Sequence, residues 1–237
     1  MVEIIPIALG GSLLSRKEVK DLDIWRSEII DLLSNYENNE KKFIIIIGGG
    51  HLARKEIGVA IDSGVNDKFE LDLIGIRCTR KNAFNFMKMF EDHNISVNKE
   101  IPESIEDAIE LLNSNDLVVM GGTSPGQTTD AVAIKIGIRL GVKRVFVATN
   151  VSHIFSEDPK INKNAKKIKS ISLKELGILS GVGSVIEPGA SFAVDPVGVS
   201  SAINSNLPLV ILNGHDVDNL RKAINGEEFI GTNVFGD

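Results

Sequence analysis

Residues 43–50 read FIIIIGGG, an uninterrupted apolar run that ends in three glycines. A β-branched run of this length, bounded by a turn signal, predicts a buried strand that enters a glycine turn. Residues 4–12 repeat the pattern as IIPIALGGS, and residues 24–33 between them carry apolar side chains at helical spacing. Because a crossover helix joins parallel neighbours, strand, helix and strand in this order predict a parallel sheet.

The same alternation continues along the chain and predicts an α/β fold with a mostly parallel central sheet. Further helices are expected at residues 50–63, 77–90, 104–113 and 130–140, and strands at residues 95–97, 117–120 and 144–148. Beyond residue 149 the chain becomes polar, and residues 152–169 predict a surface excursion. The last expected elements are helices at residues 173–179 and 199–204 and a strand at residues 208–212.

The composition is that of an ordinary globular protein, and it argues against some classes of binding partner. With 237 residues, 43% hydrophobic and 24% charged, residues 1–237 are expected to form one domain. The net charge of −6 and the lack of a dense Lys/Arg run argue against nucleic acid. The single Cys78 excludes an intrachain disulfide, and no apolar run approaches the roughly 20 residues of a membrane span. We therefore expect a cytoplasmic protein with no membrane partner.

Three glycine-containing loops follow predicted strands, at residues 10–12, 48–50 and 121–129. In a parallel sheet they collect at the carboxyl ends of the strands, where open α/β sheets bind ligands. Glycine allows backbone N–H groups to approach an anion, so the three together predict a phosphate-binding cleft. A lone glycine turn more often serves chain geometry. Neither a Gly-x-Gly-x-x-Gly fingerprint nor a P-loop is present, which indicates another class of phosphate-handling protein.

Several motifs resemble the amino-acid kinase family, and within it the archaeal uridylate kinases. They are GGTSPGQTTD (residues 121–130), ATNV (148–151), Phe155 with Asp158-Pro159, DLIGI (72–76) and VDP (194–196). The resemblance covers nearly the whole chain. It implies a three-layer α/β sandwich, with acceptor binding in residues 1–140 and ATP binding in residues 141–237. It also implies transfer of the ATP γ-phosphoryl group to UMP with Mg²⁺, in a homo-oligomer that is a hexamer.

The resemblance also assigns roles to individual residues. The ATP site would comprise Gly10, Gly11, Ser12, Gly50, Arg54, Thr149, Asn150, Phe155 and Asp158. The UMP site would comprise Gly49, Asp72, Thr123, Ser124, Pro125, Gly126, Gln127, Thr128 and Thr129. The catalytic residues would be Asp195, Arg54 and Asp130. Asp195 or Asp130 would help to hold Mg²⁺ directly or through water, although neither is assigned as a metal ligand.

Simpler readings of these residues remain open. Arg54 could instead be a solvent-exposed helix residue with no ligand. Asp72 could instead be a residue that caps a helix. The histidines read as loop or surface residues, and no His, Cys and carboxylate set has zinc spacing.

The sequence departs from the family pattern at the expected ATP side. Ala8 stands where many members carry a Lys that bridges the phosphates, and Arg54, Lys166 and Lys167 are candidate replacements. Ser152 and His153 stand where Asp-Gly is usual, and Phe155 where Tyr is common. Two alternatives therefore stay open: another small-substrate kinase of the family, and a non-catalytic nucleotide- or oxyanion-binding protein resembling the molybdenum storage proteins. The loop at residues 121–129 favours the uridylate type over another small-substrate kinase, whereas Ala8, Ser152 and His153 would suit the non-catalytic protein.

Overall fold

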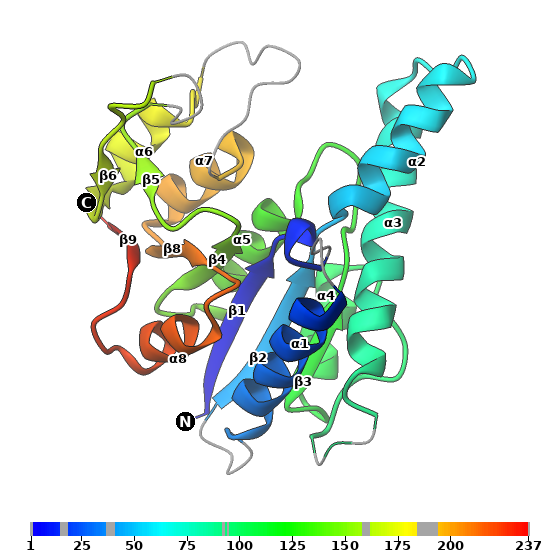
Figure 1. The fold of residues 1–237 in the computed structure, drawn as a ribbon, viewed down its shortest axis with the longest axis horizontal. Coiled ribbons are helices and arrows are strands. Elements are labelled where there is room, and N and C mark those ends of the chain that lie inside the picture. Colours follow the sequence, from blue (N-terminus) through cyan, green and yellow to red (C-terminus); the bar gives the residue numbers. More distant parts are fainter. Residues whose placement is uncertain are drawn as a thin grey trace.

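The structure, a computed structural model, describes residues 2–14, 19–36, 41–91, 93, 95–157, 162–183 and 194–236. A seven-stranded sheet in the order β3-β2-β1-β4-β8-β9-β7 forms its centre, as Figure 1 shows. The strands are β1 (Glu3–Leu9), β2 (Lys41–Ile47), β3 (Leu117–Met120), β4 (Val145–Thr149), β7 (Ser170–Ser172), β8 (Leu209–Asn213) and β9 (Gly231–Phe235). All neighbours in the sheet are parallel except β8 and β9.

The helices lie on both faces of this sheet. They are the 3-10 turn η1 (Gly11–Leu14), α1 (Val19–Ser34), α2 (Gly50–Asp62), α3 (Lys68–Lys88), α4 (Ile105–Leu111), α5 (Thr129–Leu140), α6 (Leu173–Leu179), α7 (Pro196–Ser205) and α8 (Val217–Asn225). One hydrophobic cluster joins the sheet to α1, α3 and α8, and a second joins it to α4, α5, α6 and α7. The three-layer α/β sandwich is therefore confirmed.

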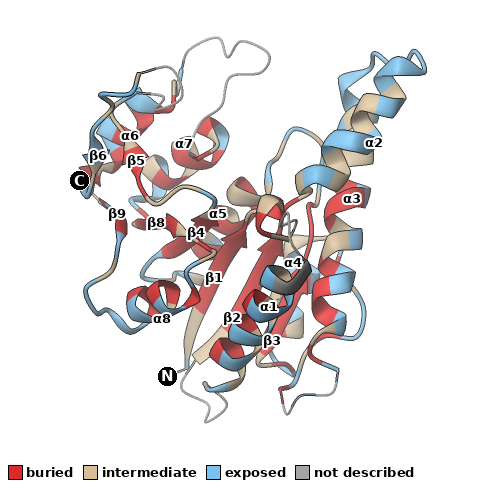
Figure 2. Cartoon of the chain, viewed as in Figure 1, coloured by how far each residue is buried: buried red, intermediate tan, exposed pale blue. Residues whose placement is uncertain are grey.

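Alternation along the strands explains why both faces are covered. In β1, Ile5, Ile7 and Leu9 belong to the cluster under α1 and α3, whereas Ala8 belongs to the cluster under α5. Strand side chains point to opposite faces with a period of two, so strands buried on both faces need apolar residues throughout. The FIIII run of β2 meets this need, and Figure 2 shows the strands buried along most of their length.

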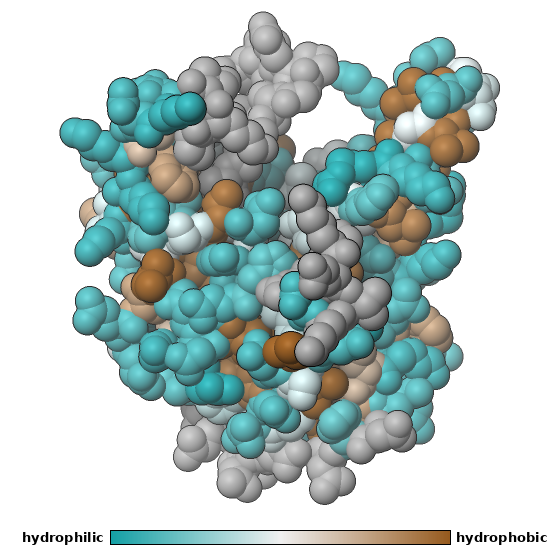
Figure 3. All heavy atoms as spheres, in the orientation of Figure 1, coloured by the Kyte–Doolittle hydropathy of each residue, from teal (hydrophilic) through white to brown (hydrophobic). Residues whose placement is uncertain are grey.

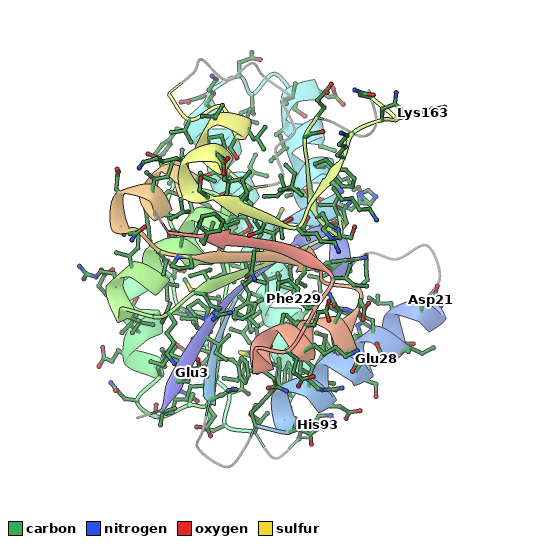
Figure 4. All side chains as sticks on the ribbon, turned by 90° about the vertical axis from the view of Figure 1, so that its left-hand side faces the viewer. Glu3, Asp21, Glu28, His93, Lys163 and Phe229 are labelled. Carbon is green, nitrogen blue, oxygen red and sulfur yellow. The ribbon has the colours of Figure 1, made fainter. Side chains whose placement is uncertain are left out.

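Several charged side chains lie at the periphery. Figure 4 shows Asp21, Glu28 and Lys163 around the rim, whereas the labelled Phe229 packs against the cluster that contains α1 and α8. None of the described helices is long and apolar enough to cross a membrane.

The order of the strands creates a switch in chain direction across the sheet. From β1 the chain adds β2 and β3 on one side and then returns to place β4 on the other side of β1. Open α/β sheets bind ligands at the carboxyl end of such a switch point. The loops that follow β1, β2, β3 and β4 meet there.

The helix pair α2–α3 projects past this end of the sheet as an arm (Figure 1). None of the described side chains of α2 is buried. Three apolar side chains are instead exposed near the end of the arm: Val59, Ile61 and Phe69. Brown apolar atoms are visible there in Figure 3.

Most of the expected elements are confirmed, with shifted ends. The helix expected at residues 77–90 begins nine residues earlier, at Lys68, because Asp67 caps it by accepting from the Phe69 N–H. The strand expected at residues 95–97 is reduced to one bridge between Val97 and Leu117. The polar excursion contains a small antiparallel pair, β5 (Ile154–Phe155) and β6 (Lys167–Ile168).

Candidate active site

The glycine turns after β1 and β2 are packed directly against each other. The Gly48 N–H donates to the Leu9 carbonyl at 2.9 Å. A Cβ added to Gly11 would lie 2.3 Å from both the Gly48 oxygen and the Gly50 nitrogen. No side chain fits at such a separation, so glycine at position 11 is required for the two turns to meet. The first glycine of the pair, Gly10, uses its N–H in a 2.9 Å bond to the Ala148 carbonyl.

The second glycine turn has the backbone geometry of an anion site. Gly49 is right-handed at φ −73° and ψ −32°, and Gly50, the first residue of α2, is left-handed at φ 58°. Successive residues of this kind turn their N–H groups toward one concave point, called a nest, which favours anions. Neither N–H has an acceptor among the described residues. The α2 dipole adds positive potential at the same place.

Helix α3 holds the loop between β3 and α5 at three points. Asp72 Oδ2 accepts from the Gly126 N–H at 2.7 Å, and Gly126 has a φ of 77°. Thr79 Oγ1 accepts from the Gly122 N–H at 2.7 Å and donates to the Ile76 carbonyl. Farther along, Arg80 Nε donates to the Gly122 carbonyl at 3.2 Å. Asp72 and this loop thus lie together, and the other carboxylate oxygen of Asp72 has no hydrogen-bond partner among the described residues.

Within this loop the predicted residues take different positions. The carbonyl of Thr123 accepts weakly from Arg80 at 3.4 Å, and Thr128 caps α5 by accepting from the Ala131 N–H. Gln127 Oε1 is buried without a hydrogen-bond partner. A buried acceptor that lacks a donor is costly, and a bound molecule with an N–H or O–H would satisfy it. Of the other members of the loop, Ser124 is exposed, Pro125 is half-buried, and Thr129 begins α5.

Two carboxylates meet where α5 and α7 begin. Asp195 caps α7, its Oδ2 accepting from the Gly198 N–H at 2.9 Å. The Asp130 carboxylate accepts from the Asp195 backbone N–H. Burial first, and then the negative charge of Asp195, raise the pKa of Asp130 to about 6, against the lowering effect of that hydrogen bond. The pair therefore concentrates negative charge that a cation would neutralise.

The carboxylate pair is the best candidate for holding a metal ion. Hard cations such as Mg²⁺ bind carboxylate oxygens. No group of three or more His, Cys, Asp and Glu side chains gathers as a metal site within the described ranges. Two carboxylates fit Mg²⁺, because that ion keeps several waters and shares its remaining positions with substrate phosphates.

The segment after β4 lies beside the first glycine turn. The Thr149 carbonyl accepts a hydrogen bond from the Gly214 N–H at 2.8 Å, and the Thr149 hydroxyl donates one to Asn150 Oδ1 at 3.4 Å. Phe155 lies in β5, opposite Lys167 of β6. Asp158 lies outside the described residues.

His153 occupies a buried position in the same segment. Its Nδ1 lies 3.0 Å from Ser152 Oγ. Burial, followed by the charges of Lys167 and Lys169, lowers the pKa of His153 and favours its neutral form.

The two remaining candidates differ in how they are held. Arg54 is exposed on the first turns of α2, with no ion pair to any described residue. Ser12 lies in η1, directly after the first glycine pair. Ala8, where the family pattern has Lys, is 1% exposed and packs in the core under α5.

Sequence reasoning identified Asp72 but missed the other α3 residues that hold the glycine loops, Thr79, Arg80 and Asn82. Asn82 Nδ2 donates to the carbonyls of Gly48 and Gly49, at 2.9 and 3.0 Å. Thr79 and Arg80 hold the third loop, more than forty residues away along the chain. A helical periodicity gives no sign of such contacts. The only sequence signal is TRKN at residues 79–82, a run of four polar residues inside the helix expected at residues 77–90.

Comparisons with known proteins are extensive. The amino acid kinase family profile matches residues 4–213. A uridylate kinase from Methanococcus aeolicus is 36% identical over 210 residues, covering 89% of this chain and 90% of its own. One from Thermoplasma acidophilum is 34% identical over 239 residues, covering 100% of this chain and 99% of its own. The crystal structure of the Archaeoglobus fulgidus uridylate kinase superposes with a TM-score of 0.80 at 29% identity, covering 98% of this chain and 100% of that one.

Proposed function

This chain belongs to the amino acid kinase family, and from that premise we propose that it is a uridylate kinase. It transfers the γ-phosphoryl group of ATP to UMP and releases ADP and UDP. The supporting relatives carry the uridylate kinase name and match the chain over nearly its whole length. The observation that carries the proposal is that three glycine loops, one of them the GGTSPGQTTD loop, follow neighbouring parallel strands at the same edge of the sheet.

The acceptor side is proposed to lie between α3 and the loop at residues 123–129, in the part of the chain before residue 141. The free oxygen of Asp72 faces no other described donor and suits a ribose hydroxyl. Gln127 Oε1 needs a donor, and the N3–H of uracil is one. Gly49 lies in the nest beside this loop and would receive the UMP phosphate.

The donor side is proposed to use the loops after β1 and β4, in the part after residue 140 together with Gly11 and Ser12. Thr149 and Asn150 supply polar groups, and the Phe155 ring supplies a face for stacking on adenine. The Gly10 N–H donates to the Ala148 carbonyl and is therefore not free to bind phosphate, so we propose that Gly10 supports this site structurally. Asp158 is retained as a donor-side residue on the family resemblance alone.

Phosphoryl transfer depends mainly on positioning and on neutralising charge. Mg²⁺, held by Asp130 and Asp195, would neutralise charge on the ATP phosphates. The chain itself supplies the nest N–H groups and the Arg54 guanidinium, which is exposed and carries the positive charge needed to replace the lysine absent at position 8. The scheme assigns no role to His153, whose burial lowers its pKa and favours the neutral form.

A homo-oligomer, with a hexamer as the expected state, and a cytoplasmic location are proposed from the same family likeness. The exposed side chains of Val59, Ile61 and Phe69 on the α2–α3 arm support self-association. Contiguous exposed apolar surface commonly marks a protein interface.

The test is a coupled ADP-release assay with ATP and Mg²⁺ against UMP, CMP, dUMP, GMP and AMP. We expect UMP to be the preferred acceptor. Isothermal titration of the same nucleotides separates the alternatives: nucleotide binding without turnover would indicate a non-catalytic binding protein. Turnover with another small phosphate or carboxylate acceptor, but with no pyrimidine monophosphate, would indicate a different kinase of the family. Either result contradicts the proposal.

A further inference from the structure

We propose that Asn82 is a positioning residue for phosphoryl transfer, which holds the second glycine turn so that its N–H groups are presented to substrate phosphate. This inference rests on the proposed function. Asn82 lies on α3 and is half-buried, and its side-chain amide reaches two consecutive carbonyls of the turn, those of Gly48 and Gly49. Asn82 lies inside α3 and therefore caps neither end of the helix.

The direction of the carbonyls fixes the direction of the N–H groups. In a trans peptide the C=O of one residue and the N–H of the next lie on opposite sides of the same plane. The Gly48 and Gly49 carbonyls point to Asn82, so the N–H groups of Gly49 and Gly50 point away from α3. These are the two N–H groups of the nest, and the described residues offer them no acceptor.

Two other contacts hold the turn but do not replace Asn82. The Gly49 carbonyl accepts the Ala53 N–H at 3.1 Å, which is the first bond of α2, and the Gly48 N–H is fixed by Leu9. Only Asn82 contacts both carbonyls among the described residues. Glycine adopts positive and negative φ with similar ease, so the peptide groups between glycines can flip at little cost. A turn of three glycines therefore needs such an external restraint.

The same helix also fixes the position of the nest relative to the loop assigned to UMP. Asn82 lies on the same helix as Asp72, Thr79 and Arg80, which hold the loop assigned to UMP. One rigid helix therefore carries both the nest and the acceptor loop. Misplacement of reacting groups by about 1 Å can cost a hundredfold in rate, so the common support is of direct use to the reaction.

The experiment compares Asn82→Asp with Asn82→Ala. Aspartate has nearly the same shape as asparagine, but it cannot donate and its charge opposes the two carbonyls. A flip of either peptide would relieve that repulsion and withdraw an N–H from the nest. We expect Asn82→Asp to lower kcat/KM for UMP about a hundredfold and Asn82→Ala about tenfold. A packing role predicts the reverse order, because alanine leaves a cavity and aspartate does not.

The matched control is Asn85→Asp, the same change at an exposed position on α3. It should leave kcat/KM within about twofold of wild type. Thermal unfolding of each variant shows whether it is folded. Titration with UMP, ADP and pyrophosphate reports phosphate binding without turnover. The affinity for these probes should fall in the same order, with Asn82→Asp the weakest binder.

The outcomes separate the two proposals. If Asn82→Asp remains folded and binds all three probes as tightly as wild type, or if Asn82→Ala is the more damaged variant, the positioning role is overturned. If wild type binds the probes with the expected dependence on Asn82 but does not phosphorylate UMP, the proposed function alone fails. If wild type binds none of the three probes, both fail.

Discussion

At the scale of single residues, Asp130 links the candidate site to stability. Its pKa of about 6 in the folded protein exceeds the ordinary value of 3.8. Between these values the folded state binds more protons than the unfolded state. The stabilisation from protonated Asp130 is thus complete below about pH 4 and is lost as pH rises through 6. The ionised form of Asp130 is therefore held at the expense of stability at neutral pH.

Asp130→Asn should raise the free energy of unfolding at pH 8 by about 2–3 kcal/mol more than it does at pH 4. Asparagine removes the charge that burial and Asp195 disfavour, and this matters only where the wild-type carboxyl is ionised. Urea unfolding of both proteins at the two pH values, with EDTA present, measures the difference. Asp62→Asn, at an exposed position, should show a pH-dependent difference of less than about 0.5 kcal/mol. Equal effects of Asp130→Asn at both pH values would contradict the assignment.

The positions of candidate residues could be predicted where they depend on neighbouring residues in the chain. They could not be predicted where they depend on contacts between distant segments. Glycines 11, 49 and 50 follow strands, so their place at the sheet edge can be read from the chain. The contact from Asn82 to Gly48 spans 34 positions and has no local signature. The charge pair of Asp130 and Asp195 likewise exists only once α5 and α7 pack together. The structure gives the positions of these residues, and their roles in binding and catalysis remain predictions.

At the scale of elements, α1 is tied to the opposite half of the sheet by a single buried donor. The indole Nε1–H of Trp25 donates to the Gly214 carbonyl at 2.8 Å, and the side chain is 1% exposed. Gly214 follows β8 directly, and a Cβ there would lie 2.5 Å from Leu13 Cδ1. The contact therefore secures the loop next to the candidate donor site as well as the helix.

Trp25→Phe should reduce the free energy of unfolding by about 2–4 kcal/mol. The change leaves the Gly214 carbonyl buried without its donor and opens a cavity in the core. Chemical denaturation followed by circular dichroism measures the loss. Tyr36→Phe is the matched control, since it removes an exposed hydroxyl that donates to Asn225 at 2.7 Å and should cost under about 1 kcal/mol. A cost no greater than that of Tyr36→Phe would show that the indole bond contributes nothing.

Element prediction succeeded for long periodic segments and failed for short ones. Strand β2 and helix α5 carry uninterrupted apolar patterns, and their expected ranges agree closely with the structure. None of the expected elements covers α8 or β9. Strand β9 reads GTNVF, with only two strongly apolar residues, and it becomes a strand through pairing with β8 and β7. Such pairing is a property of the tertiary fold, which local propensity does not contain.

At the scale of the whole molecule, the α2–α3 arm is an apolar projection without a core of its own. Phe69 is 57% exposed, Val59 54% and Ile61 48%. Two helices that pack on each other but leave such groups in water favour association with another apolar surface. This is the feature through which assembly can be tested without reference to activity.

Phe69→Glu should shift the protein to a smaller assembly, because a carboxylate placed in an apolar interface must be desolvated. Light scattering after size exclusion measures the mass across a range of protein concentration. Ile178→Glu on α6 provides the control: Ile178 is 80% exposed but lies away from the arm, so the assembly should be unchanged. An unaltered mass for Phe69→Glu, or an equal shift for Ile178→Glu, would remove the arm as the interface.

The position of β9 between β8 and β7 has a consequence for biosynthesis. Strand β7 begins at Ser170, yet its only described strand partner, β9, begins at Gly231. Thr232 on β9 is fully buried, accepting from the Ile154 N–H and donating to the Ile168 carbonyl, so it also anchors the β5–β6 pair. During translation the first four strands can assemble while this edge has no partner. The glycine turns can then form before the ribosome has supplied β9, so we expect the proposed donor side to be completed after the proposed acceptor side.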